Sequence, residues 1–146
     1  MITVITGGTG SIKLVRGLDS VLDEKMTIIT NVGDNIWLFG LYICPDIDTI
    51  LYGLSGQLDQ KKGWGIYNDT FNWLTSMNKF SDNIWFRIGD KDLDIHRLRT
   101  KLFKNGMKLS EITKLMSNRM NIKHQVIPAS NHSIETTITT NDRQMH

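Results

Sequence analysis

A β-rich segment that runs directly into a glycine loop places the strongest constraint on the fold of this chain. Residues Ile2–Thr6 are rich in β-branched side chains and end at the loop Gly7–Gly10. Leucine and valine side chains then recur at helical spacing, and a second apolar segment, Met26–Val32, follows. This order predicts a strand, a helix and a second strand, with the two strands parallel and joined by a right-handed crossover.

The glycine loop is a candidate site for a phosphate group. Gly7, Gly8 and Gly10 would let backbone N–H groups approach an anion, and the start of the following helix adds partial positive charge. Lys13 falls in the first helical turn, where a cation is unfavourable unless an anion is bound. The spacing matches neither the dinucleotide fingerprint nor a Walker loop. A tight turn without a ligand is therefore the alternative interpretation.

An acidic connection follows the second predicted strand. Beyond Gly33 it holds three carboxylates, Asp34, Asp46 and Asp48. Clustered carboxylates repel one another, and a cation or a hydrogen-bond donor relieves them, so all three are candidate metal ligands. Open α/β sheets bind ligands where their strands end. The alternative is a set of surface acids in which Asp46 or Asp48 caps a helix that we expect over Asp48–Gln57.

A second charged turn, followed by further predicted helices and strands, continues the alternation of strands and helices. The turn Gly89–Asp92 opens a long predicted helix, on which Arg97 and Arg99 are expected on the solvated face. The alternation of strands and helices predicts a single α/β domain over residues 1–146. The remaining expected elements are helices at Thr70–Met77 and after Leu109, and strands at Gln125–Pro128 and Ile134–Thr140.

Composition narrows the function classes. The chain has 146 residues, of which 40% are hydrophobic and 22% charged, which fits one globular domain with a core. Lys plus Arg total 17 and Asp plus Glu total 15, a balance that does not indicate nucleic-acid binding. The single cysteine, Cys44, allows no internal disulfide and fits a reducing, cytoplasmic setting. We expect no signal peptide and no membrane span.

With these segments described, the chain resembles the 2-phospho-L-lactate transferase family of coenzyme F420 biosynthesis, often called CofD. The resemblance covers the N-terminal half of that family, so we expect a fragment or a truncated reading frame. The matching motifs, in order, are TGGTG at 6–10, NVGDN at 31–35, GLYICPDIDTILY at 40–52, WGI at 64–66, DTF at 69–71, GDKDLDIH at 89–96 and RTKLFKNGMKLSEIT at 99–113.

The resemblance implies a Rossmann-like parallel sheet flanked by helices, left incomplete in this chain. It also implies a reaction in which a 2-phospholactyl group, or its enolpyruvyl or glyceryl counterpart, moves from a guanosine diphosphate-activated donor. The acceptor is the ribityl hydroxyl of the deazaflavin Fo, and GMP leaves. Magnesium is the implied metal, both substrates are small molecules, and a homodimer is suggested.

Site residues follow from the same resemblance. Asp48 lies in the motif that meets the deazaflavin in this family, which makes it the first candidate for catalysis, acceptor contact or metal binding. Lys91, in the charged turn, is the second candidate for acceptor binding. Trp37 could stack on the tricyclic ring, although a tryptophan that anchors its own loop is the alternative. Position 35 is Asn35 where the family usually has a second aspartate, which removes one charge from the metal pocket.

Two other functions stay open from the sequence. One is a sugar-nucleotide-binding regulator of the related gluconeogenesis-factor group, which shares the GGTG opening. The PDIDT and GDKD segments favour the transferase over this regulator. The other is a non-catalytic fragment that binds the deazaflavin and no donor.

Overall fold

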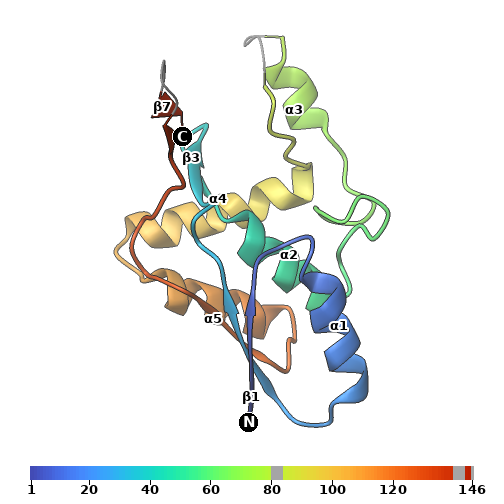
Figure 1. The fold of residues 1–146 in the computed structure, drawn as a ribbon. Coiled ribbons are helices and arrows are strands. Elements are labelled where there is room, and N and C mark those ends of the chain that lie inside the picture. Colours follow the sequence, from blue (N-terminus) through green and yellow to red (C-terminus); the bar gives the residue numbers. More distant parts are fainter. Residues whose placement is uncertain (80–83, 140–143, 146) are drawn as a thin grey trace.

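A three-stranded parallel sheet organises the chain, which the computed structural model describes over residues 1–79, 84–139 and 144–145. The strands are β1 (Ile2–Thr6), β2 (Met26–Thr30) and β5 (Gln125–Pro128), in the order β1-β2-β5. Thr6 pairs with Thr30, so β1 and β2 end at the same edge of the sheet. The glycine loop and the acidic connection both start from that edge (Figure 1). The predicted parallel α/β fold is therefore confirmed.

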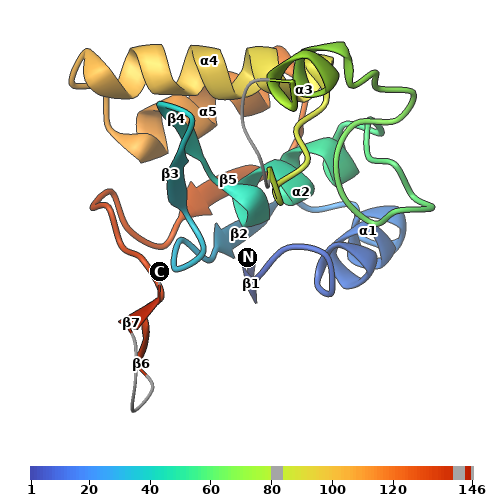
Figure 2. The same ribbon diagram turned by 90° about the horizontal axis from the view of Figure 1, so that it is seen from above.

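The described helices are α1 (Ile12–Val21), α2 (Pro45–Leu54), α3 (Asn72–Met77), α4 (Asp90–Lys104) and α5 (Leu109–Arg119). Of these, α1, α2 and α5 pack on one side of the sheet. α2 lies between α1 and α5, and α4 lies alongside α5 (Figures 1 and 2). One apolar cluster joins α1, α2, α5 and the buried face of the sheet.

The opposite face of the sheet is left uncovered by the described residues. Met26, Ile28 and Thr30 of β2 are buried, whereas the residues between them are half-buried. Ile5 of β1 points to the other face and is 84% exposed. Parallel sheets are normally covered on both faces. This open face agrees with the expectation of an incomplete sheet.

A short hairpin interrupts the connection that the sequence presents as one acidic loop. β3 (Ile36–Leu38) pairs antiparallel with β4 (Leu41–Ile43). The turn between them is Phe39-Gly40, and both residues have positive φ, 52° and 72°. This backbone conformation is typical of a two-residue hairpin turn. Strands of three residues are too short to show an alternating pattern, which is why the sequence did not predict them.

Two predicted elements have different bounds in the structure. The helix expected over Asp48–Gln57 is α2, which starts at Pro45, because proline is favoured in the first turn of a helix. The strand expected over Ile134–Thr140 is reduced to β6 (Ile138–Thr139), paired with β7 (Gln144–Met145), and Thr140 lies outside the described residues. No described helix is both long and apolar enough to cross a bilayer.

The contact between α1 and α2 allows a test of this packing. A Cβ added at Gly53 would overlap Cγ1 and Cδ1 of the buried Ile12. We expect Gly53→Ala to lower the free energy of unfolding by about 1–3 kcal/mol, because overpacking outweighs the gain in helix propensity. The control is Gly17→Ala in α1, where nothing lies within 4 Å of the added carbon. This change should stabilise the chain by up to about 1 kcal/mol in urea unfolding. Equal effects of the two substitutions on stability would contradict the close contact between Gly53 and Ile12.

Candidate functional site

The glycine loop and the acidic connection meet at the carboxyl edge of the sheet. Asp46, in the first turn of α2, lies against Gly8 so closely that a Cβ there would overlap the Asp46 carboxylate. Asn31 Nδ2 donates to Asp46 Oδ2 at 2.8 Å and to Asp34 Oδ2 at 3.4 Å. We call Gly7, Gly8, Asn31, Asp34 and Asp46 the loop site. The structure thus brings together two of the three predicted metal ligands and two of the predicted phosphate-binding glycines.

The loop site concentrates negative charge. Partial burial raises the pKa of the Asp46 carboxyl above its ordinary value; Asn31 opposes the rise, and the nearby Asp34 carboxylate adds to it. A divalent cation relieves two carboxylates held this way, and hard oxygen donors are those that Mg²⁺ prefers. The donor set of the loop site therefore fits the implied metal.

The loop's own N–H groups are partly occupied. The Gly7 N–H donates to Ser11 Oγ at 3.1 Å, and the Gly8 N–H donates to the Asp46 carboxylate. Gly10 has open space around it, and Lys13 is exposed on the first turn of α1. Phosphate binding by these residues stays a prediction, and it requires a cation between a phosphate and Asp46 or a shift of that carboxylate.

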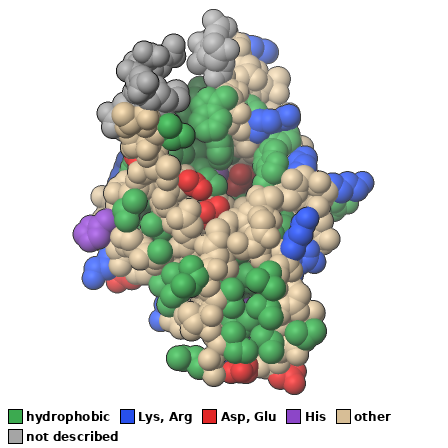
Figure 3. Space-filling model, viewed as in Figure 1, with side chains coloured by type: hydrophobic (Ala, Val, Ile, Leu, Met, Phe, Trp, Pro, Cys, Tyr) green, Lys and Arg blue, Asp and Glu red, His purple; other side chains and the backbone are tan. Residues whose placement is uncertain are grey.

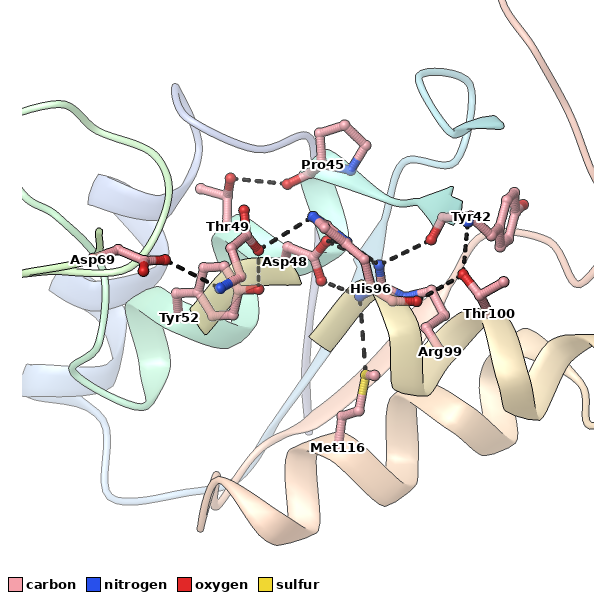
Figure 4. A network of polar contacts seen from close by, with 11 residues as sticks. Tyr42, Pro45, Asp48, Thr49, Tyr52, Asp69, His96, Arg99, Thr100 and Met116 are labelled. Carbon is pink, nitrogen blue, oxygen red and sulfur yellow. Dashed lines mark hydrogen bonds and ion pairs between the residues drawn. The ribbon is translucent and has the colours of Figure 1, made fainter. Parts of the chain in front are cut away.

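Asp48 lies apart from the loop site, inside the protein. Its two carboxylate oxygens both accept from the guanidinium of Arg99 on α4, with Arg99 Nη1 at 3.0 Å from Asp48 Oδ2 and Nη2 bonded to Oδ1 (Figure 4). Arg99 is 1% exposed, so the expectation of a solvated arginine is wrong. Because both carboxylate oxygens are taken by Arg99, Asp48 is not free to complete a metal site with Asp34 and Asp46.

A histidine and a second carboxylate extend this buried network. Arg99 Nη1 lies 3.1 Å from His96 Nδ1. Since arginine only donates, the neutral ring carries its hydrogen on Nε2. That nitrogen lies 3.3 Å from Asp92 Oδ1, in poor alignment for a hydrogen bond, while the Tyr52 hydroxyl donates to the same oxygen at 2.6 Å. Asp48, Asp92 and His96 are close enough to hold a cation, but Asp48 and His96 Nδ1 already face the Arg99 guanidinium.

Burial and pairing act in opposite directions on these carboxyls. Desolvation raises the pKa of Asp48, against the opposing effect of Arg99 and then of His96. Desolvation also acts to raise the pKa of Asp92. His96 and the Tyr52 hydroxyl outweigh it and hold the pKa of that carboxyl below its usual range. Part of the network borders a small cavity of about 50 Å³. The carboxyls and the imidazole of the network can hold a proton, and a cavity of this volume is large enough for water.

The charged turn before α4 has a structural role that the sequence did not reveal. Asp69 accepts from the backbone N–H groups of Lys91 at 2.8 Å and Asp92 at 3.1 Å, so it binds the N-terminus of α4. A Cβ at Gly89 would overlap Asp69. Lys91 Nζ donates to the carbonyl oxygen of Asn68 at 3.0 Å. The predicted acceptor ligand Lys91 is thus bound to its own loop in this structure.

Asp90 performs the matching role for α3. It accepts from the Thr70 hydroxyl at 2.5 Å and from the backbone N–H groups of Asn72 at 3.0 Å and Trp73 at 2.9 Å. The Thr70 bond is the largest of the causes that lower the pKa of Asp90 to about 2. The DTF and GDKD motifs therefore contain two aspartates that each cap a helix in or beside the other motif.

Trp37 lies on the hairpin and packs against α4. Its ring stacks on Tyr42 with centroids 5.0 Å apart and planes at 29°. The ammonium group of Lys104 lies 5.5 Å from the ring centroid, and 38% of Trp37 is exposed. This placement favours the interpretation of a tryptophan that anchors its own hairpin over that of a ring-stacking residue.

Comparisons with known proteins agree with one another. The family model described as 2-phospho-L-lactate transferase CofD matches residues 2–146. A 2-phospho-L-lactate transferase of Methanosarcina mazei is 35% identical over 144 residues, which cover 98% of this chain and 48% of that protein. A phosphoenolpyruvate transferase of Nocardia farcinica is 36% identical over 143 residues, covering 97% and 43%. The chain thus spans about half the length of the curated relatives it matches.

A solved structure also resembles this chain in fold. The crystal structure of a UPF0052 family member from Bacillus halodurans aligns with a TM-score of 0.58 and 20% sequence identity. The alignment covers 91% of this chain and 41% of that chain. At this identity the likeness concerns the fold alone.

The buried ion pair predicts that substitutions of Arg99 and Arg97, both on α4, differ widely in their effect on the free energy of unfolding. Arg99→Met leaves the Asp48 carboxylate buried without a partner, and we expect it to cost about 3–5 kcal/mol in urea unfolding. Arg97→Met removes an exposed pair with Asp94 and should change stability by less than about 1 kcal/mol. The double variant Asp48→Leu/Arg99→Met should recover most of the loss, because no buried charge remains. A double variant as unstable as the single one would contradict this account.

The capping role of Asp90 predicts a specific pH dependence. Its folded-state pKa of about 2 lies below the ordinary 3.8, so its contribution to stability is present above pH 4 and is lost as the pH falls through about 2. NMR titration of the Asp90 carboxyl should give this low pKa. We expect Thr70→Val to raise it and Thr70→Ser, which keeps the hydroxyl, to preserve it. A pKa that is unchanged in the valine variant would exclude the Thr70 bond as its main cause.

Proposed function

Because the chain belongs to the 2-phospho-L-lactate transferase CofD family, we propose that it carries part of the site of a transferase of coenzyme F420 biosynthesis. In the proposed reaction, the terminal ribityl hydroxyl of Fo attacks the phosphorus that bears the three-carbon group. The bond from this phosphorus to the oxygen of the guanosine phosphate breaks, the hydroxyl proton is released, and GMP leaves. The three-carbon group is lactyl, enolpyruvyl or glyceryl, and relatives named for the first two match this chain.

The observation that carries this proposal is the closure of the loop site. Asp34, which follows β2, and Asp46, in the first turn of α2, both accept from the amide of Asn31, and Asp46 lies directly against the glycine loop. Ligand sites of open α/β sheets lie at this position. Mg²⁺ held by Asp34 and Asp46 would neutralise charge on the donor diphosphate, which is the main requirement of phosphoryl transfer.

The remaining residues of this edge have defined tasks in the proposal. Asn31 holds the two carboxylates in a fixed orientation, and its Oδ1 accepts from the Gly33 N–H at 2.9 Å, which fixes the amide itself. The exposed Lys13 and the N-terminus of α1 supply positive charge for the donor phosphates. Gly10 leaves open space beside them.

Asp48 and Lys91 enter the proposal on the acceptor side. Asp48 borders the small cavity and acts there through its fixed pairing with Arg99. Lys91 would have to exchange its bond to the Asn68 carbonyl for one to the acceptor. Neither residue is proposed as a magnesium ligand.

The loop site predicts a defect in cation binding. We expect Asp46→Asn to weaken Mg²⁺ binding by about tenfold or more, which is about 1.4 kcal/mol, because one of two ligand carboxylates is lost. Isothermal titration of the chain with MgCl₂ measures this directly. The control Asp94→Asn changes an exposed carboxylate of α4 and should leave binding unchanged. Equal affinity in the wild type and Asp46→Asn would remove the loop site as the metal site.

A turnover assay tests the reaction itself. The chain, alone and mixed with the second half of the Methanosarcina mazei relative, is incubated with Fo, MgCl₂ and the guanylylated donor, and products are separated by chromatography. We expect phosphorylated deazaflavin and GMP in equal amounts, and less of both with Asp46→Asn. Binding of a UDP-sugar without any response to Fo would overturn the transferase in favour of a sugar-nucleotide regulator.

A further inference from the structure

A groove of about 560 Å³ lies at the amino ends of β2 and β5, away from the loop site, and continues along α5. Figure 3 shows acidic side chains gathered in a hollow above the sheet. The groove has a different character, because three lysines and one carboxylate line it. We call it the amino-edge groove, and its lining residues include Lys25, Lys114, Ser117, Lys123 and Val126.

A buried histidine fixes the sheet side of the amino-edge groove. His124 Nδ1 accepts from the Met26 N–H at 3.1 Å, and its Nε2 lies 2.8 Å from Asp19 Oδ1. Since the nitrogen that accepts from Met26 carries no hydrogen, the neutral ring donates to Asp19 through Nε2. Lys123 Nζ lies 2.9 Å from the same carboxylate oxygen. These bonds join α1 to the starts of β2 and β5, so this side of the groove is already held in place without a ligand.

The other side of the groove, formed by α5, contains a buried hydroxyl without a partner. Ser117 lines the groove and is 4% exposed, and its Oγ makes no hydrogen bond with a described residue. Helical hydroxyls often donate to the carbonyl four residues earlier, as Thr113 does to Leu109 at 2.8 Å. The Ser117 hydroxyl lacks such a bond. A buried polar group without a partner costs free energy, and a ligand oxygen that accepts from it would recover that cost.

The charges of the groove favour an anion. Lys114 precedes Ser117 by three residues, so the two side chains lie on the same face of α5. Lys25 and Lys114 both line the groove, and neither forms an ion pair with a described residue. The lining carboxylate, Glu111, already accepts from the Lys108 N–H at 2.8 Å. A lysine without a carboxylate partner, beside an unpaired hydroxyl, is a suitable donor set for the oxygens of a phosphate group.

The shape of the groove indicates a small molecule and not an added peptide strand. Pro128 ends β5 and has no N–H to offer a neighbouring strand, which is why proline is tolerated at sheet edges. The volume lies within the range of small-molecule sites, about 300–1,000 Å³. Ile122, Val126 and Ile127 also line the groove and offer apolar contact to the carbon part of a ligand.

We propose that the amino-edge groove binds a small organic phosphate, with the phosphate group held by Lys114 and Ser117 and the carbon part against Val126 and Ile127. The Ser117 hydroxyl donates to one phosphate oxygen, and the Lys114 ammonium adds a charge-assisted bond. Lys25 contributes further positive charge. This site needs no divalent cation and shares no residue with the loop site, so it is independent of the proposed function.

Titration of the ¹⁵N-labelled chain with phenyl phosphate, in EDTA and at constant ionic strength, tests this site through amide chemical shifts. We expect the largest changes at residues 114–118. Ser117→Ala and Lys114→Gln should each weaken binding by about fivefold or more, because one donor is lost. The matched control Lys101→Gln removes an exposed lysine of α4 outside the groove and should leave the affinity unchanged. Ser117→Ala removes no hydrogen bond within the described structure, so its urea midpoint should stay close to that of the wild type.

Two further probes separate the parts of the ligand. Inorganic phosphate should bind at the same residues but more weakly than phenyl phosphate, and phenol should not bind. Equal affinity of the wild type and Ser117→Ala, equal affinity for phenyl phosphate and inorganic phosphate, or shifts confined to the glycine loop would overturn the proposal. A glutamate-rich peptide that binds the groove in place of the phosphates would also overturn it. Each of these results leaves Mg²⁺ binding at the loop site, and with it the proposed function, to be decided by its own experiment.

Discussion

The buried pair between Asp48 and Arg99 sets the position of helix α2, on which the loop site and the small cavity depend. Successive residues of an α-helix are rotated by about 100°, so Asp46 and Asp48 point to roughly opposite sides of α2. The bidentate bond from Arg99 fixes the inward direction of Asp48. That same rotation turns Asp46 outward over Gly8. A structural ion pair thereby orients a carboxylate that lies outside the core.

This pair contributes more to orientation than to stability. Removing a carboxylate and a guanidinium from water costs several kcal/mol per ion, and bidentate geometry offsets much of that cost without adding a large surplus. Apolar side chains of similar volume would hold α2 and α4 together as well. They would not fix the rotation of α2, because apolar contacts are not directional. The network around Arg99 is therefore explained by the need to place Asp46 over the glycine loop.

The sequence predicted the parts of this fold that depend on local pattern. The β-branched run at Ile2–Thr6, the glycine loop and the parallel partner strand all agree with the structure, because periodicity and glycine act through the backbone. The burial of Arg99 was not predictable, since a guanidinium on a helix is normally solvated and its partner Asp48 lies 51 residues away. The caps by Asp69 and Asp90 were missed for the same reason: each acts on a helix that begins elsewhere in the chain.

The open face of the sheet bears on the same edge. Ile5, Ile29 and Ile127 are paired across the three strands, so they form one apolar row on the face that the described helices leave uncovered. Ile5 is 84% exposed, and burying its side chain would contribute about 1.5–3 kcal/mol, which favours a further layer over solvent. The row lies one residue before the last paired positions of β1 and β2, Thr6 and Thr30, from which the glycine loop and the acidic connection depart. A layer that covers these isoleucines would therefore also restrain the backbone that carries Gly8 and Asn31. Order at the loop site and cover on the far face of the sheet are coupled through the same two strands.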